Sequence, residues 1–253
     1  MSSFTRQVVI WNRPIRAVFL DAAQTLFDLK PSYAGAFAQV CRDFGYQVSE
    51  ASVAAAVTEL EGRERARIRR REGLRVSVEG LYARWVALNR FIFERVGVNG
   101  DAEALACEME RRFDSGRYAQ VYPDVFPALR ELRALGWRLG IISNGTAGMK
   151  GCLEHIGLTE GMDCVIISAL VGWEKPAREI FEEALRQTGL AAEETVFVGD
   201  HFWCDVQGAL EVGMRAVWLV RSGVFPPDLP EGAPPCPVIK SLAELAPLLT
   251  GRR

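Results

Sequence analysis

The sequence predicts an α/β protein whose core is a doubly wound, Rossmann-like parallel sheet, with an all-helical domain inserted into it. Three observations support this prediction. Short, fully apolar segments rich in β-branched residues recur along the chain, as expected of strands buried on both faces. In the second half of the chain these segments alternate with helical patterns. Between the first two of them lies a long region with helical periodicity and almost no strand signal.

The first apolar segment, Ile15–Leu20, predicts a buried strand that ends at Asp21. Residues 32–118 predict four helices, at Ser32–Phe44, Ser49–Arg71, Ser77–Val96 and Asp101–Tyr118. Ser49 and Asp101 are residue types that favour the N-cap position. We therefore expect a helical cap domain at residues 30–119. It should cover the carboxyl-terminal edge of a sheet built from residues 1–29 and 120–253.

The remaining strands are predicted at Arg138–Ile142, Asp163–Ser168, Thr195–Val198 and Arg215–Val220. Helices are predicted between them at Ala147–His155, Ala177–Thr188 and Cys204–Val212. Parallel strands joined by helices are connected by right-handed crossovers, so these elements predict one continuous sheet.

Composition limits the classes of function. A net charge of −2 over 253 residues gives no electrostatic case for nucleic-acid binding. The six cysteines contain no CxxC pair, which argues against a zinc cluster and predicts a reducing, cytoplasmic setting. No signal-peptide pattern and no run of about 18–20 apolar residues is present, so no membrane association is expected. The arginine-rich segment Arg63–Arg71 is interpreted as a solvated helix face, and both a monomer and a homodimer remain open.

Polar residues that could react or bind a ligand follow four of the predicted strands. They are Asp21, the Ser143–Asn144–Gly145 turn, Lys175, Asp200 and Asp205. Ligands of open α/β sheets bind at the carboxyl ends of the strands, so we expect these groups to converge. A carboxylate such as Asp21 can act as a nucleophile, and three carboxylates supply the hard oxygens that Mg²⁺ prefers. The serine hydroxyl, backbone N–H groups and the lysine would bind phosphate oxygens.

Four segments carry a resemblance to a known family: VFLDAAQTLF at Val18–Phe27, IISNG at Ile141–Gly145, GWEKPAREIF at Gly172–Phe181 and VFVGDHFWCDVQGALEVGM at Val196–Met214. The chain resembles the haloacid dehalogenase-like (HAD) hydrolase superfamily, subfamily I, with a helical C1-type cap. This resemblance implies a Rossmann-like core, a Mg²⁺ cofactor, a small phosphorylated metabolite as substrate and a covalent aspartyl intermediate.

The resemblance also implies a role for each residue. Asp21 resembles the nucleophile, Ser143 the phosphate-binding hydroxyl and Lys175 the stabilising lysine. Asp200 and Asp205 resemble the acids on the metal side. The backbone carbonyl of Ala23 would be the remaining protein ligand of the metal.

The first motif departs from the DxDGT pattern of the family's phosphatases. Ala23 stands where the second Asp belongs, and Gln24 stands where the Gly belongs. The missing carboxylate would protonate the leaving group and activate water, which is worth about 10²–10⁴ in rate. We therefore expect a slow phosphatase, or a substrate that needs no leaving-group acid. Gln24 is placed to orient a water or the phosphate, but it cannot shuttle protons.

Rival functions remain open. One is a phosphate- or ligand-binding protein without meaningful turnover, and another is a 2-haloacid dehalogenase, for which Arg42 would be the cap arginine. Phosphonatase chemistry is disfavoured, because it needs a cap lysine and none occurs between Pro31 and Gly145. His201, next to Asp200, is a candidate substitute for the missing acid–base group, whereas His155 is interpreted as structural.

Overall fold

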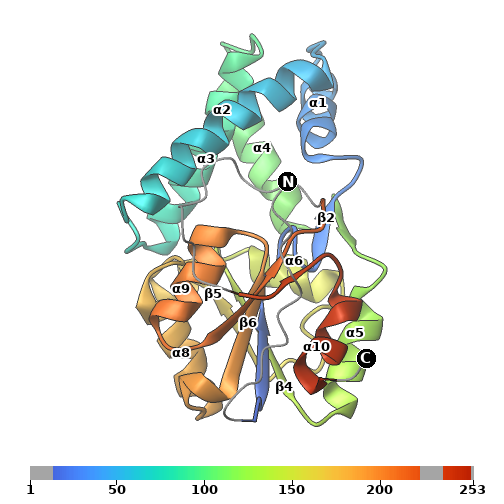
Figure 1. The fold of residues 1–253 in the computed structure, drawn as a ribbon. Helices are drawn as coiled ribbons and strands as arrows, with labels where there is room; N and C mark the ends of the chain where they lie inside the picture. Colours follow the sequence, from blue (N-terminus) through green and yellow to red (C-terminus); the bar gives the residue numbers. More distant parts are fainter. Residues whose placement is uncertain (1–13, 223–235, 252–253) are drawn as a thin grey trace, which may run out of the picture.

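A six-stranded parallel sheet forms the core of the computed structural model, which describes residues 14–222 and 236–251 (Figure 1). The spatial order is β5-β4-β1-β6-β7-β8. The strands are β1 (Ala17–Leu20), β4 (Arg138–Ser143), β5 (Cys164–Ile167), β6 (Thr195–Gly199), β7 (Arg215–Leu219) and β8 (Val238–Ile239). β1 lies between β4 and β6, with Leu20 opposite Ile141 and Val198. The strand order therefore reverses at β1, where ligands of such sheets bind.

Both faces of the sheet are covered by helices, which explains why the strand interiors are apolar on both sides. Val18 and Leu20 point into a cluster with α5 (Val125–Ala134), α6 (Met149–His155) and α10 (Leu245–Thr250). Ala17 and Phe19 point to the opposite face, against α8 (Arg178–Thr188) and α9 (Gly208–Glu211). The predicted doubly wound core is confirmed. The short helix α7 (Ser168–Val171) and the 3₁₀ turns Ala192–Glu194 and Leu242–Glu244 complete it.

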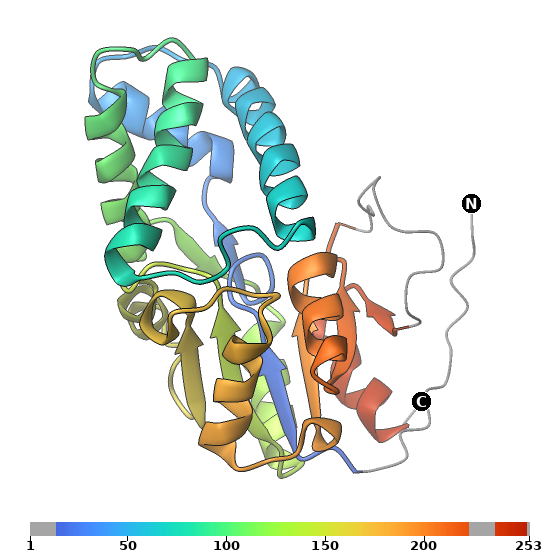
Figure 2. The same ribbon diagram turned by 90° about the vertical axis from the view of Figure 1, so that its left-hand side faces the viewer.

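Four helices form a separate layer above the carboxyl ends of the strands (Figures 1 and 2). They are α1 (Tyr33–Asp43), α2 (Glu50–Arg69), α3 (Val78–Arg95) and α4 (Ala102–Asp114), close to the predicted ranges. They enclose a hydrophobic cluster of their own, with the Phe37 and Phe93 rings 5.0 Å apart. We refer to α1–α4 and their connections as the cap; its exact boundaries remain a prediction.

One of the two predicted N-caps makes the expected hydrogen bond. The Ser49 hydroxyl accepts the N–H of Ser52 at 3.1 Å and caps α2. Asp101 precedes α4 but makes no capping bond, because its carboxylate accepts the Tyr46 hydroxyl at 2.6 Å instead. A tertiary contact has therefore displaced the local one that the sequence predicts.

A short antiparallel ribbon marks the two points at which the chain passes between sheet and cap. It pairs β2 (Phe27–Leu29) with β3 (Ala119–Val121). Strands of three residues leave no readable alternation, so the sequence did not predict them. No helix in the described part of the chain is both long and apolar enough to span a bilayer.

Candidate active site

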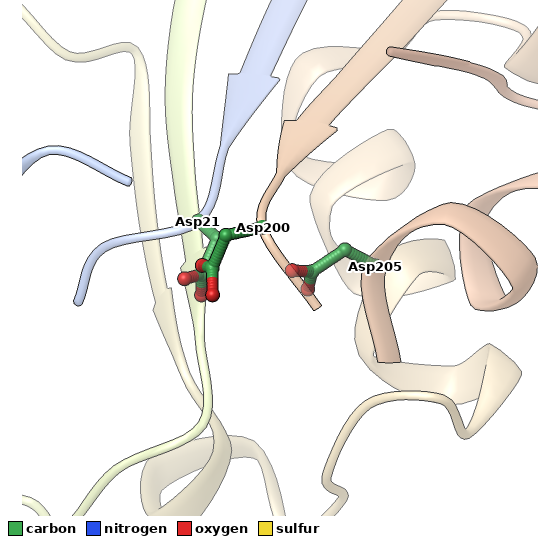
Figure 3. Close-up of side chains that lie close together, drawn as sticks. All are labelled: Asp21, Asp200 and Asp205. Atoms are coloured by element: carbon green, nitrogen blue, oxygen red, sulfur yellow. The ribbon is translucent and has the colours of Figure 1, made fainter. Parts of the chain in front are cut away.

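Three carboxylates meet at the carboxyl end of the central strands (Figure 3). Asp21 follows β1, and its N–H donates to Val198 on β6 at 2.9 Å. Asp200 follows β6, and Asp205 lies four residues beyond His201 in a π-helical turn, η2 (Phe202–Gln207). One carboxylate oxygen from each Asp lies within 4.8 Å of the other two. The structure thus brings together the three acids that the sequence assigned to one site.

Lys175 is enclosed between two of these acids. Its Nζ donates to Asp21 Oδ1 at 2.5 Å and to Asp205 Oδ1 at 2.7 Å, and its side chain is 2% exposed. The peptide of Lys175 is held as well. Asn144 Oδ1 accepts the Lys175 N–H at 2.8 Å, and Asn144 Nδ2 donates to the Lys175 carbonyl at 3.0 Å. Side chains of the site therefore hold both the backbone and the ammonium group of Lys175 in place.

These contacts refine the predicted phosphate-binding turn. The Asn144 side chain is committed to Lys175, and the Gly145 N–H donates to the Ser168 hydroxyl at 3.0 Å. Ser143 ends β4 and is 1% exposed; its hydroxyl makes no hydrogen bond within the described residues. Of the three residues in the turn, Ser143 therefore keeps its side-chain donor available for a ligand.

A second network, which the sequence did not predict, holds Asp200. Thr25 Oγ1 donates to Asp200 Oδ1 at 3.0 Å, and Trp218 Nε1 donates to the Asp200 carbonyl at 2.8 Å. Arg221 donates to the Thr25 carbonyl at 2.7 Å and pairs with Asp124 at 3.0 Å. Trp218 lies in β7, and Arg221 follows this strand. Their place in or after an apolar run is the one feature of the sequence that could have indicated a position near the site.

Asp205 is oriented by its own turn. Its Oδ2 accepts the His201 N–H at 2.9 Å while Oδ1 faces Lys175. The helix predicted at Cys204–Val212 is instead the π-helical turn η2 followed by α9. Such turns are frequent at functional sites because they redirect side chains. Here the turn directs Asp205 back toward the strand ends.

His201 has a structural partner that argues against the acid–base role considered for it. Its Nδ1 accepts the Cys204 N–H at 3.1 Å, which assigns the remaining proton to Nε2. Burial, together with the positive charge of Lys175, lowers the pKa of His201 to about 4. A neutral imidazole has no acidic proton to give near pH 7, which argues against His201 as a replacement for the missing Asp.

The site carries an excess of negative charge. Burial raises the pKa of Asp21 to about 6 even though Lys175 opposes the shift. Burial and the charges of Asp21 and Asp205 raise the pKa of Asp200 well above its ordinary value. Burial would lower the pKa of Lys175, but the two carboxylates outweigh this and raise it. Three carboxylates lie near a single ammonium, which contacts two of them, and a divalent cation would relieve the repulsion between the three. The donor set therefore fits Mg²⁺.

The loop after Asp21 differs from the rest of the site because two of its side chains are exposed. Ala23 and Gln24 face solvent, and Gln24 has a φ of 62°, in the left-handed region that favours glycine. Its N–H donates to the Phe27 carbonyl at 2.7 Å, which holds this turn. No backbone N–H of the described residues donates to the Ala23 carbonyl, so that oxygen keeps its capacity to bind a cation.

Two residues considered from the sequence lie on the surface. Arg42 is exposed in the last turn of α1, where Nη2 donates to Gln39 Oε1 of the same helix at 2.8 Å. This contact gives the dehalogenase reading no support from Arg42. His155 is exposed at the end of α6.

Comparisons with known proteins identify relatives of this chain by sequence and by fold. A family model described as haloacid dehalogenase-like hydrolase matches residues 15–213. Human haloacid dehalogenase-like hydrolase domain-containing protein 3 is 31% identical over 241 residues, which are 93% of this chain and 94% of that protein. Glyceraldehyde 3-phosphate phosphatase from Methanopyrus kandleri is 35% identical over 132 residues, which are 51% of this chain and 57% of the phosphatase. The magnesium-bound HAD-hydrolase YfnB from Bacillus subtilis has a similar fold, with a TM-score of 0.75 and 24% identity over 94% of this chain and 99% of that one.

Proposed function

Because the chain belongs to the haloacid dehalogenase-like hydrolase family, we propose that it is a Mg²⁺-dependent phosphatase that forms a covalent phosphoryl intermediate on Asp21. The observation that carries the proposal is the cluster of Asp21, Asp200 and Asp205, whose carboxylate oxygens lie within 4.8 Å of one another beside the Lys175 ammonium. The proposed substrate is a small phosphorylated metabolite. The similarity to glyceraldehyde 3-phosphate phosphatase supports this class of substrate.

Each residue has a part that follows from its position. Asp21 would attack the phosphorus with the carboxylate oxygen that Lys175 does not hold. Asp21, Asp200, Asp205 and the Ala23 carbonyl would hold the metal ion, which neutralises charge between the nucleophile and the phosphate. Lys175 and the Ser143 hydroxyl would bind phosphate oxygens. The network of Thr25 and Arg221 would keep Asp200 in place when the charge at the site changes.

The proposed reaction lacks a leaving-group acid. Ala23 offers no proton donor, and His201 is engaged as a neutral acceptor. The enzyme is therefore expected to favour substrates whose leaving group departs without protonation, such as aryl phosphates. With alkyl phosphates the rate is expected to be about 10²–10⁴ lower than in an enzyme with the acid present.

The direct test compares the wild type with Asp21→Asn on an aryl phosphate, each with and without Mg²⁺. Turnover is expected in the wild type with Mg²⁺ only, with a loss of at least about 10³-fold in the variant. Asp28→Asn is the matched control, because Asp28 is an exposed acid in β2 of the ribbon. Equal activity of wild type and Asp21→Asn would reject the proposal.

A second candidate, ligand binding without turnover, is favoured by one observation: the side chain at position 23 is a methyl group. Ala23→Asp restores the carboxylate on an exposed loop, where it costs little burial energy. A phosphatase held back only by this residue is expected to gain at least about 10²-fold in rate on an alkyl phosphate. No gain, together with Mg²⁺-dependent phosphate binding by calorimetry, would favour the binding role.

A further inference from the structure

We propose that Glu174 is a positioning residue that links the cap to the catalytic lysine: arginines from two cap helices hold its buried carboxylate, and the next residue, Lys175, bridges Asp21 and Asp205. This inference rests on the proposed function for the role of Lys175. It assigns a purpose to a buried charge, and to part of an arginine-rich segment, that the phosphatase mechanism does not use.

The contacts of Glu174 come from both sides of the cap. Oε1 accepts Arg84 Nη2 of α3 at 2.5 Å, and Oε2 faces Arg67 Nη1 of α2 at 3.5 Å. The Glu174 side chain is 1% exposed, whereas those of Arg67 and Arg84 are 16% and 23% exposed. An ionised carboxylate at this depth is stable only while it is paired. The interpretation of Arg63–Arg71 as a solvated helix face therefore does not hold at Arg67, whose side chain is largely buried.

Arg67 is held by two partners other than Glu174. Its Nε donates to Glu64 Oε2 at 2.8 Å, and its Nη1 also donates to the Glu72 carbonyl at 2.9 Å. Both partners belong to α2 or to the residues just after it. A guanidinium held in this way loses less rotamer freedom when it donates a further hydrogen bond. The Arg67 guanidinium is thus held within the cap, so its position follows the position of the cap.

Backbone pairing supports the same contact. The connection between α2 and α3 runs beside the segment before Lys175, with the Glu174 N–H donating to the Leu74 carbonyl at 2.9 Å. The Val76 N–H donates to the Gly172 carbonyl, also at 2.9 Å. Figure 2 shows this connection crossing over the core from the end of α2 to the start of α3. Glu174 is therefore bound to the cap through its main chain and its side chain.

The other end of the link is the active site. Lys175 is adjacent in sequence, its peptide is held by Asn144, and its Nζ lies between Asp21 and Asp205. A shift of the cap that carried Arg67 and Arg84 away would remove both cations from the Glu174 carboxylate, one residue from this lysine. The cap position and the lysine position are thereby coupled through one dipeptide.

A second ion pair between cap and core provides a contrast. Arg71 contacts Glu211 of α9, but these side chains are 46% and 39% exposed. Exposed pairs contribute little, because water and salt screen them and two long side chains must be ordered. Glu211 has the same chemistry as Glu174, and it too joins cap to core. It lacks the burial and the neighbouring lysine, so it is the matched control.

The experiment compares Glu174→Gln with Glu211→Gln in the full chain. Steady-state kinetics on an aryl phosphate and hydrogen exchange at the Val76 amide are measured for each. In Glu174→Gln, kcat is expected to fall about tenfold or more, because small displacements of catalytic groups are costly, and Val76 exchange is expected to rise. Glu211→Gln is expected to stay within about twofold of wild type in both.

The conservative variant Arg84→Lys keeps the charge but loses the fork geometry, and it serves if Glu174→Gln does not fold. It is expected to change kcat and Val76 exchange in the same direction, with unfolding stability closer to wild type. Equal kcat and equal exchange in the position 174 and position 211 variants would overturn the proposal. So would a fall in unfolding stability without a change in kcat. If the wild type shows no Asp21-dependent turnover, the proposed function fails, while the exchange comparison still tests the link to the cap.

Discussion

The core and the cap each bury carboxylates, but the partners of these carboxylates differ. In the core, Asp21 and Asp205 share the Lys175 ammonium at 2.5 and 2.7 Å. In the cap, Glu110 is 3% exposed between α3 and α4, and within the described residues its carboxylate accepts one hydrogen bond, from the Asn89 amide at 2.5 Å. Both Asp21 and Glu110 are buried, but among the described residues only Asp21 has a cation paired with it.

The consequence is a different protonation state. Burial raises the pKa of Glu110 to about 8, with the charge of Asp114 adding to the shift. Burial raises the pKa of Asp21 only to about 6, because Lys175 opposes it. Glu110 is therefore mostly neutral at pH 7, whereas Asp21 is mostly ionised and able to act as a nucleophile. A neighbouring cation, rather than burial alone, separates a structural acid from a reactive one.

Removing the cation of the core is expected to have the largest effect. Lys175→Met leaves Asp21 and Asp205 buried next to each other, which should lower the free energy of unfolding by about 3–5 kcal/mol at pH 7. Denaturant unfolding measures this, with Lys150→Met on the exposed side of α6 as the control. A loss below about 1 kcal/mol would mean that the two regions do not differ as described.

Removing the titration of the cap acid should have the next largest effect. The folded pKa of Glu110 lies above its ordinary value of 4.5, so its contribution is fully present below pH 4.5 and is lost as pH rises through about 8. This rise in pKa corresponds to at most about 5 kcal/mol. Glu110→Gln should flatten the wild-type decline in unfolding free energy between these pH values. Parallel pH profiles of wild type and variant would show that Glu110 is ionised in the folded protein.

The smallest expected effect concerns the backbone of the core site. Gln24 has a φ of 62°, which costs a residue with a side chain about 1–2 kcal/mol. Gln24→Gly should therefore raise the free energy of unfolding by about 0.5–1 kcal/mol after the entropy of glycine in the unfolded chain is included. Gln39→Gly, within α1, should instead be destabilising by about 1 kcal/mol. If Gln24→Gly is destabilising, the backbone at position 24 does not lower the stability of the core site, and only its buried charges do.

Most of the core was predictable because its signals are local in the sequence. Runs such as Ala17–Leu20 are apolar at every position only when both faces of a strand are covered, and Asp21 and Asp200 follow the ends of such runs. The ribbon of β2 and β3, the π-helical turn η2 and the partner of Asp101 were not predictable. Each depends on a contact between residues distant in the chain, or on a segment too short to show periodicity.

The sequence by itself determined which groups are present: three acids, of which Asp21 is the proposed nucleophile, a lysine, and an alanine where the family's phosphatases have a proton donor. Only the tertiary structure decided how these groups are held. In it, the Asn144 side chain binds the Lys175 peptide, the His201 ring accepts a hydrogen bond from the Cys204 N–H, and Glu174 is buried between two cap arginines. The physical reason is that sequence spacing places side chains along one element, whereas burial and partners arise only when separate elements pack together.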